Sequence, residues 1–416
     1  MGNKTILIIA QNKGRGSGIV VKQQASYLTS QNHKVIVMYP DNQCSETEPI
    51  NINIKLHTNI IPVHEYLPTE KNQKPVHSMS DKEALEYITD YENALEEAVK
   101  QHSPNLIIAH HANISTVAAC KIARKYDIPY IVFIHGTGVE PRFGGLFNTK
   151  YDDAVWAKIK EAVEFSNGII VTTKYVLQKL VKPMFDLEKK PVLVQPLSID
   201  LTEKGYNPLN TVKEVPSVDK EGKVKKIHKL PKEYVVCPSG SLTEAKGFPN
   251  IIKAAPHFLD IVPLFITGDG PLRTKYEKLI EQDPQLKNKI HILGYISPKF
   301  KAGLINGALL SIFAPNKYEH YGIAITESLG GGTPVVAYHG GGVDSIITKD
   351  LGILTERTPN DLGKSIRGLL QDNDKLNRMS KKARLASEKR FNVEILGPQF
   401  ESFLLNIINE EVKRKL

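Results

Sequence analysis

The sequence predicts an α/β protein made of two doubly wound domains, each with a mainly parallel sheet. Short β-branched runs alternate with segments of helical periodicity, and this alternation restarts after a polar segment at residues 202–232. The length of 416 residues and the hydrophobic content of 41% are enough for two cores of ordinary size. The carboxyl ends of the two sheets are expected to face a shared ligand cleft.

The first domain is expected over residues 1–199. Its strands are predicted from β-branched runs at residues 5–10, 34–39, 105–109, 130–135, 168–172 and 191–195. Apolar side chains recur with helical spacing at residues 22–29, 84–99, 115–126 and 158–165. Strands and helices therefore alternate along the chain, as a parallel sheet requires.

A linker or insertion is expected at residues 200–232, where Lys, Glu, Pro and Gly are frequent and large apolar residues are few. The second domain follows at residues 233–390. Its strands are predicted at residues 234–238, 263–267, 290–293, 310–314 and 334–338. Its helices are predicted at residues 247–258, 272–281, 301–306 and 323–330, with further helices in the tail.

Charge and hydropathy exclude several classes of protein. Almost all of the net charge of +9 lies after residue 200, which suits a phosphate-bearing ligand. The lysines at 223–232 are interpreted as a solvated loop, and no nucleic-acid-binding signature accompanies them. No apolar stretch approaches the roughly 20 residues that span a bilayer, and the first apolar run lacks the features of a signal peptide. A cytoplasmic protein without a nucleic-acid partner is expected.

Two glycine-rich loops are similar to phosphate-binding motifs but do not match them. Residues 14–18 follow the first strand, yet a GxGxxG match fails because Ile19 stands at its last glycine. In residues 240–247, Ala245 precedes Lys246, where a P-loop has glycine. Nicotinamide, flavin and ATP-hydrolysing functions are therefore disfavoured. Backbone amides at a helix start can still approach an anionic ligand in either loop.

Other polar motifs have structural explanations. The DxD at Asp372–Asp374 is interpreted as a turn between helices, and Cys44, Cys120 and Cys237 are too scattered for a disulfide framework or a zinc ribbon. No metal and no cofactor are expected. His110 and His111 follow a strand and could face the cleft, but paired histidines at strand ends are as often structural.

The most informative segment is residues 319–337, EHYGIAITESLGGGTPVVA. Glu319 and Glu327 are eight positions apart across a transition from loop to helix. Because Ile323, Ile325 and Leu329 surround them, a solvated charged face is a poor explanation of this segment.

Together with residues 240–247, 268–271 and 340–344, this segment resembles the retaining glycosyltransferases of family 4. Those enzymes have the GT-B fold of two facing Rossmann-like domains. The resemblance extends along nearly the whole chain, through the first glycine loop, His135 with its following glycine, and the linker motif at 196–200. It also implies that the C-terminal segment, residues 391–416, is a helix that crosses back to the first domain.

The resemblance implies transfer of a hexose from a nucleotide sugar, with retention of configuration and without a metal. Breaking the glycosidic bond puts negative charge on the diphosphate, which Lys246 is placed to stabilise. By the same resemblance, Glu327 holds the ribose hydroxyls, Glu319 orients the donor sugar, and His135 contacts that sugar from the first domain. Further donor contacts are expected at Arg15, Gly16, Gly18, Gly240, Ser241, Gly268, Gly322 and Ile323.

Three positions depart from the family pattern. The family has Arg where Ser241 stands, Gly where Ser198 stands and Glu where Asp344 stands. The first departure removes a guanidinium that would grip the diphosphate, and Arg15 is the candidate to replace it.

Two other functions stay open beside the transferase: a GT-B sugar-nucleotide epimerase and an inactive homologue that binds nucleotide sugars. A UDP-sugar is favoured as the donor, with a GDP-sugar possible. The acceptor is a saccharide, a lipid-linked glycan or a small molecule. Peripheral membrane contact has little support, because the first domain is close to neutral.

Overall fold

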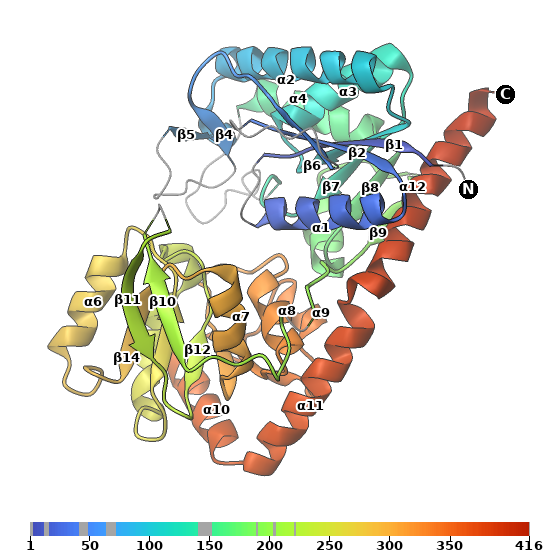
Figure 1. Ribbon diagram of the computed structural model, residues 1–416. Coiled ribbons are helices and arrows are strands. Elements are labelled where there is room, and N and C mark those ends of the chain that lie inside the picture. Colours follow the sequence, from blue (N-terminus) through green and yellow to red (C-terminus); the bar gives the residue numbers. More distant parts are fainter. Residues whose placement is uncertain are drawn as a thin grey trace. The chain divides into compact units, whose positions relative to one another are not determined.

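The chain forms two compact units in the computed structural model, which describes residues 3–11, 16–40, 49–63, 72–139, 152–188, 190–202, 205–219 and 222–415 (Figure 1). The first unit consists of Met1–Ser198 together with Glu394–Leu416. The second consists of Ile199–Val393. Each unit has its own parallel sheet and its own core, so each is described by itself.

The described part of the first unit contains a seven-stranded parallel sheet with the order β3-β2-β1-β6-β7-β8-β9. The strands are β1 (Thr5–Ile9), β2 (Lys34–Tyr39), β3 (Ile50–Asn53), β6 (Leu106–His110), β7 (Tyr130–Ile134), β8 (Gly168–Val171) and β9 (Val192–Val194). Side chains of β1, β6, β7 and β8 are buried on both faces, which explains why these strands read as continuous apolar runs rather than as alternating ones.

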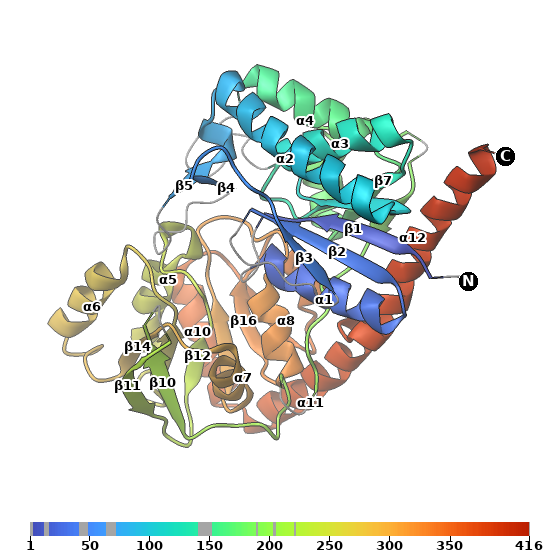
Figure 2. The ribbon, with the colours of Figure 1, turned by 45° about the horizontal axis from the view of Figure 1, so that its top comes forward.

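Helices cover both faces of this sheet. They are α1 (Ser17–Ser30), α2 (Asp81–His102), α3 (Ile114–Tyr126), α4 (Asp153–Phe165) and α12 (Val393–Lys415), with a π-helical segment at Val176–Val181. Figures 1 and 2 show α2, α3 and α4 on one face and α1 on the other. An apolar cluster of this unit lies between the strands and the α2–α4 face, and it includes Trp156 of α4.

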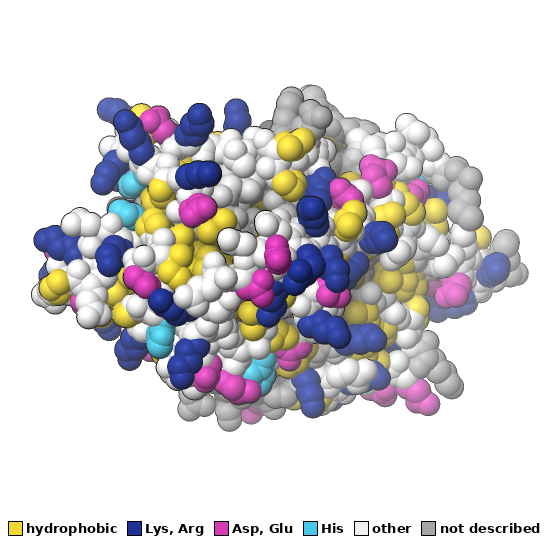
Figure 3. Space-filling model, turned by 90° about the horizontal axis from the view of Figure 1, so that it is seen from below, with side chains coloured by type: hydrophobic (Ala, Val, Ile, Leu, Met, Phe, Trp, Pro, Cys, Tyr) yellow, Lys and Arg dark blue, Asp and Glu magenta, His cyan; other side chains and the backbone are white. Residues whose placement is uncertain are grey.

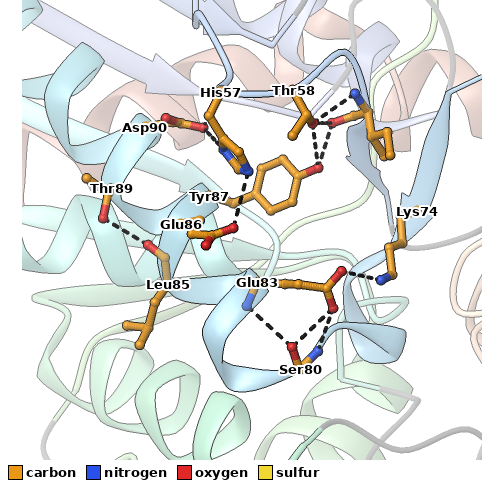
Figure 4. A network of polar contacts seen from close by, with 11 residues as sticks. His57, Thr58, Lys74, Ser80, Glu83, Leu85, Glu86, Tyr87, Thr89 and Asp90 are labelled. Carbon is orange, nitrogen blue, oxygen red and sulfur yellow. Dashed lines mark hydrogen bonds and ion pairs between the residues drawn. The ribbon is translucent and has the colours of Figure 1, made fainter.

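Polar contacts fasten the segment before α2 to that helix (Figure 4). Ser80 caps α2 and forms a reciprocal capping box with Glu83, which also pairs with Lys74 of β5 (Gln73–Pro75). His57 Nδ1 lies 2.6 Å from the Asp90 carboxylate. β5 pairs with β4 (Ile61–Val63), so these contacts attach a short two-stranded sheet to the helix.

The C-terminal helix α12 is built into the first unit from residue 394 on. The Glu401 carboxylate accepts a hydrogen bond from Tyr27 at 3.2 Å and lies 2.9 Å from His33 Nε2. Gly397 packs so closely on the Tyr27 ring that a Cβ there would collide with it. Gln195 donates to the Leu396 carbonyl at 2.7 Å, which joins the helix to the end of β9.

The described part of the second unit contains a six-stranded parallel sheet with the order β14-β13-β12-β15-β16-β17. The strands are β12 (Val235–Cys237), β13 (Leu264–Thr267), β14 (Ile290–Gly294), β15 (Leu310–Phe313), β16 (Val335–Tyr338) and β17 (Gly352–Thr355). The helices are α5 (Phe248–Ala254), α6 (Arg273–Gln282), α7 (Pro298–Asn306), α8 (Ile323–Gly330), α9 (Val343–Ile346), α10 (Pro359–Leu370) and α11 (Asn373–Arg390). Asp372 caps α11 by accepting from Lys375 N, so the DxD lies at a helix start, as a connecting turn would.

The segment at 200–232 differs from the exposed linker that its composition predicts. It contains an antiparallel hairpin of β10 (Glu214–Val218) and β11 (Val224–Lys229), and Tyr206 and Val215 within it are buried in the second unit. The lysines of β11 are solvated as expected, but they belong to a strand and not to a loop.

The described residues contain no helix that is long and apolar enough to cross a membrane. On the face drawn in Figure 3, Lys and Arg side chains lie among Asp and Glu side chains. Cys120 and Cys237 are buried free thiols, whereas Cys44 lies outside the described residues.

Candidate active site

Most of the predicted site residues of the second unit lie on loops that leave the carboxyl ends of four parallel strands, and Ile323 and Glu327 lie in the helix α8 that follows one of these loops. These loops follow β12, β13, β15 and β16, at residues 238–247, 268–272, 314–322 and 339–342. Since the strands are parallel, all four loops leave the sheet at the same edge. This edge is where ligands of open α/β sheets bind.

Lys246 and Glu319 form the central ion pair of this edge. Lys246 Nζ lies 2.7 Å from Glu319 Oε1, and both side chains are partly shielded from solvent. Burial acts to raise the pKa of the Glu319 carboxyl, but the Lys246 ammonium outweighs it and the pKa lies below its ordinary value. The carboxylate is therefore ionised at neutral pH, beside a cation whose side chain is 32% exposed.

The glycine loop after β16 lies against Glu319. Gly342 N donates to the Glu319 carbonyl at 2.7 Å, and the backbones of Glu319 and Gly341 form an isolated parallel β-bridge. Gly340 and Gly341 have φ of 113° and 78°, and a Cβ at either position would collide with Tyr318 or Glu319. The glycines are thus required for this close approach.

Side chains hold the loop before Glu319 in place. Asn316 Nδ2 donates to the Glu244 carbonyl at 2.6 Å, and Asn250 Nδ2 lies 2.8 Å from Asn316 Oδ1. On the other side, the Arg357 guanidinium donates to the Pro315 carbonyl at 2.6 Å. The turn that carries Lys246 and the loop that carries Glu319 are therefore tied together independently of the ion pair.

Gly240, Ser241 and Gly268 lie together on the neighbouring loops. The backbones of Ser241 and Asp269 form an isolated parallel β-bridge. A Cβ at Gly268 would collide with the carbonyl oxygen of Gly240. The Asp269 carboxylate lies 3.3 Å from Arg273, whose guanidinium also binds Glu277 at 2.7 Å. Arg273 is thus already paired with two carboxylates.

A second ion pair involves Glu327, which lies in helix α8. This helix follows Gly322 (φ 85°) and begins with Ile323. Glu327 is 7% exposed, and its carboxylate lies 2.5 Å from Lys301 Nζ. Burial, and then the Glu327 carboxylate, raise the pKa of the Tyr206 hydroxyl well above its ordinary value. Glu327 is therefore held by a cation and a tyrosine, in contacts separate from those of Glu319.

The first unit carries the remaining predicted residues. Gly16 (φ 48°) precedes α1 and Gly18 is buried in its first turn, whereas Arg15 lies outside the described residues. His135 directly follows β7, and its Nε2 lies 3.0 Å from His110 Nδ1. His135 thus stands at the carboxyl end of β7, and Gly16 stands at the start of the helix that follows β1 in the chain.

Sequence reasoning missed three of these partners. Lys301 binds Glu327, Arg357 braces the loop before Glu319, and His110 contacts His135. Lys301 and Arg357 stand in ordinary charged stretches with no motif around them, so no sequence signal distinguishes them. His110 did carry a signal, as a histidine at the end of an apolar strand.

Two family models match the chain. The model of Glycosyltransferase Family 4 matches residues 14–203, and the model of Glycosyl transferases group 1 matches residues 219–386. A protein of Methanocaldococcus jannaschii, named as an uncharacterized glycosyltransferase, is 27% identical over 59% of this chain and 61% of its own length. The alpha-D-kanosaminyltransferase of Streptomyces kanamyceticus is 29% identical over 40% of this chain and 44% of its own length. The chain therefore spans less than two thirds of these relatives.

Solved structures show the same fold. The sucrose-phosphate synthase of Thermosynechococcus elongatus superposes with a TM-score of 0.75 at 17% identity, covering 98% of this chain and all of its own. The Anabaena protein HepE, solved in complex with UDP-glucose, superposes with a TM-score of 0.67 at 15% identity, over 97% of this chain and all of its own.

Proposed function

Since this chain belongs to the glycosyltransferases of the family 4 type and has the GT-B fold, we propose that it is a retaining hexosyltransferase that uses a nucleotide sugar as donor. The observation that carries the proposal is the Lys246–Glu319 ion pair at the carboxyl edge of the second sheet. A cation next to an ionised carboxylate, surrounded by glycine loops, fits a ligand that has both an anionic group and a polar ring.

The chemistry of transfer accounts for each partner of the pair. As the bond between the sugar and the diphosphate breaks, negative charge grows on the leaving phosphate and positive charge on the sugar ring. Lys246 would stabilise the former, together with backbone amides of the glycine loops. Glu319, kept ionised by Lys246, would bind the hydroxyls of the donor sugar. This arrangement supplies the fixed positive charge without a metal ion.

The donor would extend from this pair toward Glu327. That carboxylate is held by Lys301 and would accept hydrogen bonds from the ribose hydroxyls. UDP is the favoured nucleotide, because HepE, which has the same fold, was solved in complex with UDP-glucose. His135 and Gly16 belong to the first unit, which would serve as the acceptor-side domain. The acceptor is a saccharide, a lipid-linked glycan or a small molecule.

The test is a donor screen. Purified protein is incubated with UDP-, GDP- and ADP-hexoses, with and without simple glycoside acceptors, and nucleoside diphosphate release is measured. We expect release from one nucleotide class, and an α-linked product from an α-linked donor by NMR. A product of inverted configuration would overturn the retaining assignment. An epimerised donor formed without an acceptor would instead favour the epimerase, and tight UDP binding without release from any donor would favour an inactive homologue.

A matched pair of lysine variants ties the activity to this site. Lys246→Ala removes the cation of the ion pair. Lys253→Ala removes an exposed lysine from the nearby helix α5. Release that falls in the first variant and persists in the second assigns the chemistry to Lys246.

A further inference from the structure

Two histidines at the carboxyl ends of adjacent strands share one hydrogen bond. His110 is the last residue of β6 and His135 follows β7, and these strands pair in parallel. His110 Nδ1 and His135 Nε2 are 3.0 Å apart. Both rings stack on Phe133, at centroid distances of 5.0 Å for His110 and 4.6 Å for His135.

His110 differs from its partner in its surroundings. It is completely buried, whereas His135 is partly exposed. Its second ring nitrogen, Nε2, is also buried and has no hydrogen-bond partner among the described residues. Burial lowers the pKa of His110 to about 3, so the ring is neutral at physiological pH and carries a single N–H.

That single N–H can be placed by the surroundings. If it stood on Nε2, it would be a buried donor without an acceptor, which native structures rarely contain. On Nδ1 it is satisfied by His135 Nε2. His110 Nδ1 is then the donor and His135 Nε2 is the acceptor. Because His135 Nε2 accepts, a neutral His135 must carry its own proton on Nδ1.

We propose that His110 is a positioning residue for His135: it donates from Nδ1 to His135 Nε2, and thereby fixes both the ring plane and the Nδ1–H tautomer of His135. His135 would thus present a hydrogen-bond donor, from a preset ring, to an oxygen of the donor sugar. The tautomer assignment stands on the geometry of the first unit alone. The consequence for catalysis rests on the proposed function.

Ring-nitrogen NMR tests the tautomer without any activity. In protein labelled with ¹⁵N-histidine, the shifts and couplings distinguish a protonated from a bare ring nitrogen, and a His135→Asn sample identifies the signals of His135. We expect Nδ1–H in the wild type and in His110→Asn, because an asparagine amide nitrogen occupies nearly the place of Nδ1 and can still donate. His110→Phe keeps a ring to stack on Phe133 but has no donor, so the Nδ1–H tautomer of His135 is no longer enforced and we expect Nε2–H to become populated. His135 as Nε2–H in the wild type would overturn the proposal.

Phenylalanine is larger than the ring it replaces, so His110→Leu serves as a second variant that removes the same hydrogen bond. The fluorescence of Trp156, the single tryptophan of the chain, shows whether the first unit is folded in each variant. A folded Leu or Phe variant in which His135 keeps Nδ1–H as completely as the wild type does would refute the donor role of His110.

Kinetics test the consequence for transfer. We expect His110→Phe to lower kcat about tenfold with little change in the donor KM, as for the loss of one hydrogen bond that preorganises a contact, and His110→Asn to recover most of it. His102→Asn is the matched control. His102 is the last residue of α2 and lies near the amino ends of the strands, whereas His110 lies at their carboxyl ends. Equal losses in the Asn and Phe variants would reduce His110 to a packing role. If the wild type transfers no sugar, the proposed function fails while the NMR result still decides the tautomer.

Discussion

Lys246 and Glu319 are 73 positions apart in the chain, yet their side chains meet at 2.7 Å. The pair is preorganised, because Asn316 and Arg357 hold the loop before Glu319 through its backbone and its neighbours. A site that keeps its charges in place before the substrate arrives pays little reorganisation energy during the reaction.

Lys246→Ala is expected to lower kcat/KM by about 10² to 10³, the magnitude for loss of one preorganised group that stabilises developing charge. The reduction should appear mainly in turnover, because the phosphate charge that Lys246 meets grows as the bond breaks. Steady-state kinetics at saturating donor measure it, with Lys253→Ala as the control. An unchanged kcat in the Lys246 variant would remove this lysine from the mechanism.

Glu319→Gln and Glu327→Gln are expected to affect different kinetic constants. Glu327 would bind the ribose equally in the ground and transition states, so its variant should mainly raise the donor KM. Glu319 would contact the reacting sugar, so its variant should mainly lower kcat. Lys301→Met provides a further check, since it leaves Glu327 without its cation and should act like Glu327→Gln. The opposite division between kcat and KM would show that the two roles are exchanged.

The buried His110 predicts how the stability of the first unit depends on pH. Its folded pKa of about 3 lies below the value near 6.5 of an unfolded histidine, so only the unfolded state binds this proton between the two values. Stability is therefore highest above pH 6.5 and falls as the pH decreases toward 3, by about 1.4 kcal/mol per pH unit for one such group.

Urea unfolding followed by Trp156 fluorescence measures this dependence, because Trp156 lies in the core of the first unit. His110→Asn removes the titrating group, so its free energy of unfolding should fall less steeply between pH 7 and pH 5 than that of the wild type. Parallel curves for the two proteins would show that His110 takes up its proton in the folded state as readily as in the unfolded one.

The sequence was informative wherever a segment was buried on both sides. The predicted strands at 34–39, 130–135 and 310–314 correspond to β2, β7 and β15 within a residue at each end. Short strands with half-buried side chains, such as β3 and β17, were missed because runs of only four residues, even the alternating Ile-Asn-Ile-Asn of β3, give too weak a pattern. The hairpin β10–β11 was missed because lysine is rare in strands, and the structure uses it on a solvated edge.

In the candidate site, too, some residues could be predicted from the sequence and others could not. Glycines that permit a close approach, such as Gly268 and Gly341, appear in the sequence as motifs because no other residue fits there. The partners of a functional side chain can come from any element that reaches it. Lys301 meets Glu327 from α7, and no spacing in the chain predicts that contact.

Activity is expected to survive EDTA. In the proposed site, Lys246 and backbone amides supply the positive charge that the diphosphate needs, and the described residues include no group of three or more His, Cys, Asp or Glu side chains able to hold a metal ion. The measurement is the rate of donor-dependent transfer after dialysis against EDTA. Loss of activity that returns on addition of Mg²⁺ or Mn²⁺ would overturn the prediction.

The last prediction concerns the serine at position 241, where the family has an arginine. Arg273 is nearby but is already paired with Asp269 and Glu277, so it is a poor replacement for the missing guanidinium. Lys317, two residues before Glu319, is a second rival, and the candidate preferred from the sequence is Arg15, which lies outside the described residues. If it replaces the missing charge, Arg15→Ala should cost about 2 to 4 kcal/mol of transition-state stabilisation, as for loss of a preorganised donor.

The test is a double-mutant cycle on kcat/KM, in which Ser241→Arg is introduced into the wild type and into Arg15→Ala. We expect Ser241→Arg to recover part of the activity that Arg15→Ala loses, and to add little to the wild type, because the diphosphate already has its guanidinium there. Arg273→Ala in place of Arg15→Ala is the control and should show no such recovery. An equal effect of Ser241→Arg in both backgrounds would mean that the two positions are uncoupled, and that Arg15 does not compensate for the serine.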